Sequence, residues 1–263
     1  MTPQKKQAIL IISFGTSIKE AKEKSLDSFE KRIRQTYPLW EVRHAFTSRI
    51  IIHRLKMQDG IAIDTIEEAL NRLKSEGFTH ILIQPTYIIN GREHHQMQKM
   101  LLLYQKNFVS MKIGTPLLSS SCDLKTVISG LMENYPDLPE DVGILFLGHG
   151  TACSSNTVYS KFEDIARQMG YSKLYTGTIK MSSDMDSVLL RIRQSGCKKI
   201  ILHPLLFLAG YHTRNEIAGS APSSWKSRLN VCGIETVCIC KGLGEYPCIQ
   251  QLFLKHMASA LEK

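Results

Sequence analysis

The 263-residue chain is 43% hydrophobic and 22% charged, a balance typical of a soluble globular protein large enough for one big α/β domain or two smaller ones. No apolar stretch reaches the roughly 20 residues of a membrane-spanning helix, and the apolar run after Lys6 is too short for a signal peptide, so we expect a cytoplasmic protein. The net charge of +9 favours an anionic partner or a solvated basic surface, but without a long basic run or a helix-turn-helix pattern we expect no nucleic acid and no membrane partner.

In chain order, short apolar runs alternate with amphipathic stretches of helical length. The first half predicts strands at 8–12, 40–46, 80–84 and 112–118, and helices at 17–37, 47–59, 64–76, 92–107 and 123–135. Two prolines and three acids between Tyr135 and Asp141 indicate a linker. The second half predicts strands at 143–147, 173–179, 198–202 and 234–239, and helices at 155–169, 184–194, 213–230 (broken near Pro222) and 246–261.

Strands separated by helices predict right-handed crossovers and parallel sheets. We therefore predict an α/β fold of two similar Rossmann-like halves, each a four-stranded, mainly parallel sheet flanked by helices, with a cleft between them. The predicted halves are 1–136 and 141–263, and the second carries most of the metal-site residues. The seven cysteines contain no Cys-x-x-Cys pair, which favours reduced thiols over a zinc site.

Chemistry in open α/β folds gathers at the carboxyl ends of the strands. His149 lies there between Gly148 and Gly150, after a run of four bulky apolar residues. Taken alone, Gly-His-Gly also fits simple turn chemistry, but a similar strand-to-turn unit occurs at Ser13-Phe14-Gly15-Thr16-Ser17. Neutral imidazole suits a borderline divalent metal or proton transfer near neutral pH.

His212 follows the third strand of the second half, where it is either a second imidazole of this site or a partly buried residue at a helix start. Glu93, in a first-half loop with His94 and His95, offers a carboxylate, and His203 is expected in the core. A serine hydrolase is disfavoured because the Gly-x-Ser-x-Gly spacing is absent. The Ser13–Ser17 loop can cradle an anion but lacks the lysine and spacing of a P-loop.

At these residues the chain resembles the anaerobic sirohydrochlorin cobalt chelatases of the class II chelatase superfamily, relatives of ferrochelatase. The matching motifs run along nearly the whole chain: Ser13-Phe14-Gly15-Thr16-Ser17, Ala45-Phe46-Thr47-Ser48, Arg54-Leu55 with Asp59-Gly60, Ile88-Ile89-Asn90-Gly91, Thr115-Pro116-Leu117-Leu118, Gly148-His149-Gly150, Ala209-Gly210 with His212, Ser224-Trp225-Lys226 and Gly242-Leu243-Gly244-Glu245. The resemblance implies two α/β halves around a tetrapyrrole cleft.

It also implies that His149 binds the incoming metal and accepts pyrrole protons, that His212 is a second ligand, and that Glu93 is the facing acid. A third ligand is implied by a Gly-x-x-Glu motif, but the chain reads Gly177-Thr178-Ile179-Lys180 here, and a protonated ammonium has no lone pair for a metal. Three accounts are open: Lys180 swings away while Glu93, Asp184 or Asp186 supplies the carboxylate, Lys180 is held neutral, or the insertion reaction is lost or changed.

From the resemblance we expect insertion of cobalt(II), with iron and nickel as alternatives, into an anionic, sirohydrochlorin-like tetrapyrrole for anaerobic cobalamin synthesis. The implied reaction needs no nucleotide. The tetrapyrrole would contact Ser13, Phe14, Gly15, Thr16, Arg54 and Lys180. The rivals are a chelatase with a different metal or macrocycle, such as iron and a porphyrin, and a non-catalytic tetrapyrrole or haem carrier. Whether the chain forms a homo-oligomer is left open.

Overall fold

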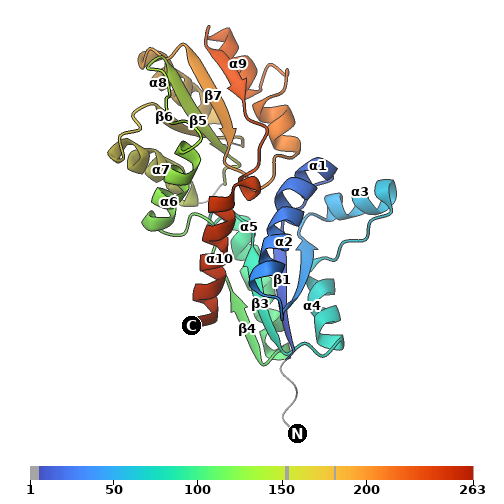
Figure 1. Ribbon diagram of the computed structural model, residues 1–263. Helices are drawn as coiled ribbons and strands as arrows, with labels where there is room; N and C mark the ends of the chain where they lie inside the picture. Colours follow the sequence, from blue (N-terminus) through green and yellow to red (C-terminus); the bar gives the residue numbers. More distant parts are fainter. Residues whose placement is uncertain (1–5, 152–153, 181, 263) are drawn as a thin grey trace. The chain divides into compact units, whose positions relative to one another are not determined.

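The structure, a computed structural model, describes residues 6–151, 154–180 and 182–262, except for the side chains of residues 154 and 182–184. The chain forms two compact units (Figure 1). Unit 1 comprises Met1–Ser119 and Ile249–Lys263, and unit 2 comprises Ser120–Cys248.

Unit 1 holds a four-stranded sheet in which every pair of neighbours is parallel, in the order β2-β1-β3-β4. The strands are β1 (Gln7–Ser13), β2 (Glu41–Phe46), β3 (His80–Pro85) and β4 (Ser110–Ile113). The helices are α1 (Lys19–Ala21), the π-helix η1 (Lys22–Asp27), α2 (Ser28–Thr36), α3 (Arg49–Asp59), α4 (Ile66–Ser75), α5 (Arg92–Tyr104), the 3₁₀ turn η2 (Gln105–Asn107) and, from Ile249 onward, α10 (Pro247–Glu262).

Unit 2 repeats this sheet with the parallel order β6-β5-β7-β8. Its strands are β5 (Val142–Gly148), β6 (Leu174–Thr178), β7 (Lys199–Pro204) and β8 (Glu235–Cys238). Its helices are α6 (Ser121–Met132), η3 (Ser154–Asn156), α7 (Thr157–Gln168), α8 (Ser182–Gln194), the π-helix η4 (Thr213–Ile217), α9 (Trp225–Val231) and η5 (Leu243–Glu245).

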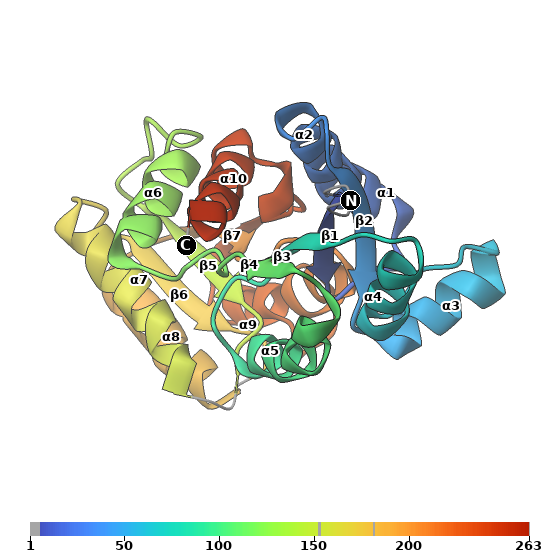
Figure 2. The same cartoon turned by 90° about the horizontal axis from the view of Figure 1, so that it is seen from below.

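Helices cover both faces of each sheet, which is why the central strands are continuous apolar runs. In unit 1, Leu10 of β1 packs in one core with Leu70 of α4 and Leu101 of α5. Figure 2 shows α2 and α10 on the opposite face, where the rings of Phe29 and Phe253 lie 5.5 Å apart. In unit 2, α8 and α9 cover one face, while the Phe162 ring of α7 packs 5.6 Å from Phe146 on the other.

The two parallel sheets confirm the predicted α/β fold with similar halves. In both, the central strand pairs first with a neighbour on one side and then with the next strand on its other side. The switch points therefore lie at the carboxyl ends of β1 and β3 and of β5 and β7, the places where open sheets bind ligands. The cleft between the halves stays a prediction.

The domain boundaries differ from the predicted ranges 1–136 and 141–263. Helix α6 packs on α7 and belongs to unit 2 together with the expected linker, which is a loop inside that unit. The last helix returns to unit 1, because its apolar face covers the sheet through Phe253.

Two predicted elements differ as well. The fourth strand is Ser110–Ile113 instead of 112–118. Gly114 still donates its amide to the carbonyl of Ile83 in β3, but Pro116 has no amide to donate, so the ladder does not continue. The helix expected at 213–230 is broken around Pro222 as predicted, but its first part, η4, is a π-helical turn and only the second, α9, is an α-helix. No helix among the described residues is long and apolar enough to cross a bilayer.

Candidate functional site

Two imidazoles meet at the switch point of unit 2. His149 directly follows β5, and His212 precedes η4 in the segment after β7. Their rings lie 4.9 Å apart, centroid to centroid, at an interplanar angle of 67°. Both side chains are partly exposed, so a ligand can reach them. The structure thus brings together the two histidines that the sequence singled out.

The turn that presents His149 depends on its two glycines. Gly150 has φ +79°, and a Cβ there would lie 3.0 Å from the Cβ of Thr178. A Cβ on Gly148 would overlap the ring of Tyr159, whose hydroxyl is within 3.4 Å of the Gly150 amide. Larger residues at either position would displace the loop that presents His149.

His212 is held by a carboxylate one helical turn further along. Its Nδ1 lies 2.6 Å from Oε2 of Glu216. The two side chains are 34% and 42% exposed, respectively. The sequence reasoning did not single out Glu216, although an acid four residues after a candidate ligand histidine is a spacing that places both on one side of a helical turn.

Lys180 follows the neighbouring strand β6, and its backbone is tied to the histidine loop. Its amide donates to the carbonyl oxygen of His149 at 3.1 Å, beside the bond from the Ile179 amide to Gly148 at 2.9 Å. The side chain is exposed. Within the described part of the chain, its ammonium has no ion-pair partner.

The carboxylates considered as substitutes for the missing family glutamate are differently placed. Asp186 is exposed and pairs with Arg228 at 2.5 Å. The side chain of Asp184 lies outside the described residues. Among the described residues no group of three or more His, Cys, Asp or Glu side chains is arranged to hold a metal ion, so the candidate site of unit 2 rests on its two imidazoles.

In unit 1 the predicted anion loop follows β1. Gly15 has φ +93°, Ser13 and Thr16 are buried, and the Phe14 side chain is 46% exposed. The Oγ1 of Thr16 accepts a hydrogen bond from the Ile18 amide at 3.1 Å. Arg54 on α3 reaches the end of this loop, with its Nη1 3.4 Å from Oγ of Ser17. Arg54 therefore lies next to the Ser13–Ser17 loop, whose first residues are expected, like Arg54, to contact the tetrapyrrole.

Glu93 lies in the first turn of α5, half-buried, and belongs to unit 1. Beside it His94 is 4% exposed, with Nδ1 2.6 Å from Oδ1 of Asn90, and burial lowers its pKa to about 4. His95 faces solvent. That Glu93 adds a carboxylate to His149 and His212 stays a prediction, since it comes from the other unit.

His203 is fully buried, as expected, and belongs to the core of unit 2. Its Nε2 lies 2.8 Å from the Tyr246 hydroxyl and its Nδ1 3.0 Å from the carbonyl oxygen of Pro204. Burial lowers the pKa of His203 to about 4, and the positive charge of Lys241 adds to this lowering. The hydrogen bond to the Pro204 carbonyl opposes it with a smaller raising effect. A neutral imidazole with both nitrogens in use is a structural residue.

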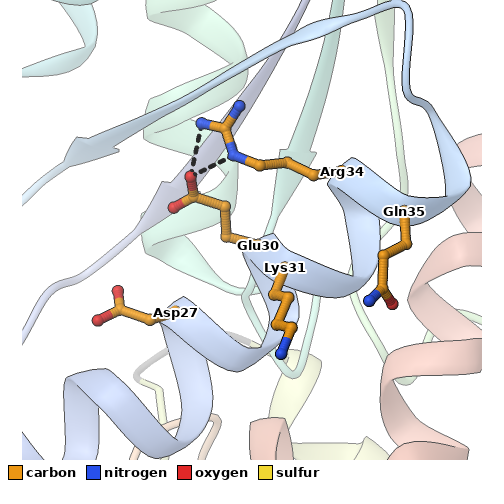
Figure 3. Close-up of a pocket in the computed structure, with 5 residues that line it drawn as sticks. All are labelled: Asp27, Glu30, Lys31, Arg34 and Gln35. Atoms are coloured by element: carbon orange, nitrogen blue, oxygen red, sulfur yellow. Dashed lines mark hydrogen bonds and ion pairs between the residues drawn. The ribbon is translucent and has the colours of Figure 1, made fainter.

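A hollow of about 440 Å³ in unit 1 contains none of the predicted site residues (Figure 3). It is lined by Asp27, Glu30, Lys31, Arg34 and Gln35. Burial alone would raise the pKa of Glu30, but hydrogen bonds and charge from His44 and Arg34 outweigh it and hold that pKa at about 2. Of the side chains that line the hollow, Glu30 and Arg34 pair with each other, as the dashed contacts in Figure 3 show.

Relatives match this chain over nearly its whole length. The sirohydrochlorin cobaltochelatase of Salmonella typhimurium is 32% identical over 256 residues, 97% of each chain. The sirohydrochlorin cobaltochelatase CbiKC of Nitratidesulfovibrio vulgaris is 30% identical over 262 residues, 98% of this chain and 92% of its own. Among solved structures, SirB from Bacillus subtilis with Fe3+ superposes with a TM-score of 0.65 at 15% identity, covering 97% of this chain and 95% of that one, a likeness of fold.

The family that matches spans both units and therefore both strand-end loops. The family model described as cobalt chelatase (CbiK) matches residues 7–262, which include the imidazole pair of unit 2 and the Ser13–Ser17 loop of unit 1. The chain belongs to the cobalt chelatase (CbiK) family.

Proposed function

We propose that this protein is a chelatase that inserts cobalt(II) into sirohydrochlorin, in the cytoplasm, for anaerobic cobalamin synthesis. The observation that carries the proposal is the pair His149 and His212, with rings 4.9 Å apart at the switch point of a sheet, in a chain of the cobalt chelatase family. Its curated relatives are named for this activity. The six cysteines that the structure describes form no disulfide, which agrees with a reducing compartment.

The reaction exchanges two pyrrole N–H protons for one divalent cation, with no change of oxidation state. Neutral imidazole binds borderline divalent metals and accepts protons near neutral pH. His149 and His212 would hold the ion through two nitrogens and leave its other coordination positions to the macrocycle. We assign His149 to deliver the ion and accept a pyrrole proton, His212 to hold the ion, and Glu93 to act as a second acid or base.

The anionic macrocycle needs both an apolar surface and cations. We assign the Ser13–Thr16 loop to its binding, with the exposed ring of Phe14 against the macrocycle. Arg54, beside this loop, and Lys180, beside His149, are assigned to peripheral carboxylates. At the position where the family resemblance implies a glutamate metal ligand, Lys180 would then contact the substrate.

The test is an anaerobic assay of the purified protein with sirohydrochlorin and cobalt(II), followed by the absorbance change of the macrocycle. We expect acceleration over a protein-free control, and loss of that acceleration in His149→Ala. The matched control is His80→Ala, at the start of β3 and so at the opposite end of its sheet, which should keep the wild-type rate. A His149→Ala protein with the full rate would overturn the assignment.

A second candidate is a tetrapyrrole carrier without turnover, favoured by the exposed ammonium of Lys180 at the position of a family metal ligand. The same assay separates the two. A shifted sirohydrochlorin spectrum with no acceleration by cobalt, iron or nickel would support the carrier. Acceleration with iron or nickel but not cobalt would keep a chelatase and change its metal.

A further inference from the structure

The chain around His212 has an unusual backbone. The segment after it, Thr213–Ile217, is a π-helical turn closed by a hydrogen bond from the amide of Ala218 to the carbonyl of Thr213 at 3.0 Å. Single π-turns are rare and concentrate at functional sites. Here the turn carries Glu216, whose carboxylate reaches back to His212.

The contact between these two side chains bears on which ring nitrogen of His212 carries the proton. Nδ1 of His212 and Oε2 of Glu216 lie 2.6 Å apart. An ionised carboxylate only accepts hydrogen bonds, so Nδ1 must be the donor. In a neutral imidazole the other nitrogen, Nε2, then holds the free lone pair, and this is the nitrogen left to take a metal ion or a proton.

The contact also restrains the orientation of the His212 ring. A ring held at Nδ1 keeps its position beside His149, 4.9 Å away. Among the described residues Glu216 makes no ion pair other than the one to His212. Carboxylates that accept from the far nitrogen of a ligand histidine fix its tautomer and raise its basicity.

We propose that Glu216 is a positioning residue for His212. It holds the imidazole as the Nδ1–H tautomer and so keeps Nε2 available beside His149. It acts through the imidazole, not as a metal ligand. This inference rests on the proposed function, because it assigns how one half of the imidazole pair is kept ready for the incoming ion.

The test compares Glu216→Ala and Glu216→Gln with the wild type. Glutamine keeps an oxygen acceptor of nearly the same shape but removes the charge. The matched control is Glu235→Gln, an exposed acid of β8 that pairs with Lys199. The first readout is the protonation of the two His212 nitrogens in metal-free protein by ¹⁵N NMR, with the signal assigned by its loss in His212→Gln.

We expect the Nδ1–H tautomer in the wild type and in Glu235→Gln, and a mixture of tautomers in Glu216→Ala. The second readout is cobalt(II) affinity without tetrapyrrole, from the visible absorption of bound cobalt. Affinity should fall about 10- to 100-fold in Glu216→Ala and less in Glu216→Gln. In the assay with sirohydrochlorin, the loss should fall on the KM for cobalt more than on kcat.

Three results would overturn the inference. One is an Nε2–H tautomer of His212 in the wild type, and another is unchanged cobalt affinity in Glu216→Ala. The third is a cobalt(II) affinity that falls as much in Glu216→Gln as in His212→Gln, while the His212 tautomer in Glu216→Gln stays that of the wild type. This result would make Glu216 a direct metal ligand. The tautomer is measured without turnover, so a failure of the proposed function, seen as a fully active His149→Ala, is distinguishable from each of these.

Discussion

The loops after β1 and β5 have similar backbone conformations and differ in their side chains. β1 runs into Ser13–Gly15 and β5 into Gly148–Gly150, and the last glycine of each triplet has a positive φ, 93° and 79°. The middle residues are Phe14 and His149. The same turn therefore presents an exposed aromatic ring in unit 1 and an imidazole in unit 2.

The match extends to the neighbouring strand ends. The amide of Ser48 donates to the carbonyl of Phe14 as the amide of Lys180 does to that of His149, at 3.2 and 3.1 Å. After β3 and β7, Glu93 and His212 each stand two residues beyond a glycine whose carbonyl accepts the first helical hydrogen bond.

Three pairs of matching positions thus carry different chemistry: Phe14 and His149, Ser48 and Lys180, and Glu93 and His212. The backbone fixes where a side chain is presented, and the residue chosen there decides what it does. Unit 2 holds the imidazole pair, while unit 1 offers an apolar ring and a carboxylate. This contrast predicts that unit 2 supplies the metal ligands and unit 1 most of the contacts to the macrocycle, with Lys180 as the macrocycle contact from unit 2.

Substitution at the first matching pair gives the largest expected effect. His149→Ala should lower kcat for cobalt insertion by about 100-fold or more, because it removes a proton acceptor and metal donor. Phe14→Ala should instead raise the KM for sirohydrochlorin several-fold and leave kcat within about twofold, because it removes apolar contact area only. Steady-state kinetics with each substrate varied separates the two effects. Equal losses of kcat in both variants would contradict the division of labour.

A second contrast lies in the cores. His203 of β7 and Gln84 of β3 are both buried and both contact the carbonyl of the proline that follows, at 3.0 and 2.8 Å. Only the histidine can titrate. The pKa of His203 is about 4 in the folded protein, against an ordinary value of 6.5. Between these two pH values the unfolded chain binds a proton at this histidine and the folded protein does not.

His203 should therefore reduce stability as the pH falls from about 6.5 to 4, by about 3 kcal/mol, with no further loss below that range. His203→Gln, which copies unit 1, should remove this part of the acid sensitivity. His94 in unit 1 also has a pKa of about 4, so the acid sensitivity that it contributes should remain in His203→Gln. Urea unfolding at about pH 7.5 and pH 4.5 measures both. An unchanged pH dependence in His203→Gln would show that this histidine is not the source.

The two loop glycines allow a stability comparison. Gly15→Ala adds a Cβ that overlaps the ring of Phe46, whereas the Cβ of Gly150→Ala meets Thr178 at 3.0 Å, and both need a positive φ. We expect losses of about 3 kcal/mol for Gly15→Ala and about 1 to 2 kcal/mol for Gly150→Ala in urea unfolding. Alanine at Gly77, also at positive φ but with open space, serves as the control for backbone strain alone. A larger loss at Gly77 than at Gly15 would show that crowding is not the decisive difference.

The sequence predicted the strands well because each central strand is a continuous apolar run, as at Ile9–Ile12, bounded by clear turn residues. It singled out His149 because this histidine follows a buried strand and the Ser13–Ser17 unit of the first half repeats the same strand-to-turn pattern. The unit boundaries could not be read in the same way. Whether α10 packs on the first or the second sheet depends on a contact such as that of Phe253 with Phe29, over 200 residues away along the chain.

Glu216 and the π-turn η4 were missed for a similar reason. The sequence around Arg214 fits an ordinary α-helical turn, so its residue types do not predict the wider π-helical turn found at Thr213–Ile217. The acid gains significance only when His212 is seen against His149. Local patterns predicted the positions, and three-dimensional contacts added the partner that holds one of them.

The smallest effect is expected at the pair Ser48 and Lys180. If Lys180 contacts a peripheral carboxylate of the macrocycle, Lys180→Ala should raise the KM for sirohydrochlorin by about 2- to 5-fold, the usual range for an exposed charge pair. Lys180→Glu should raise it further by repulsion while lowering the KM for cobalt(II), because it restores the acid that the family resemblance implies. Both effects should shrink at high salt. An unchanged KM for sirohydrochlorin in both variants, with cobalt insertion improved by Lys180→Glu, would mean that the lysine is merely a lost ligand, and that unit 2 contacts the metal alone.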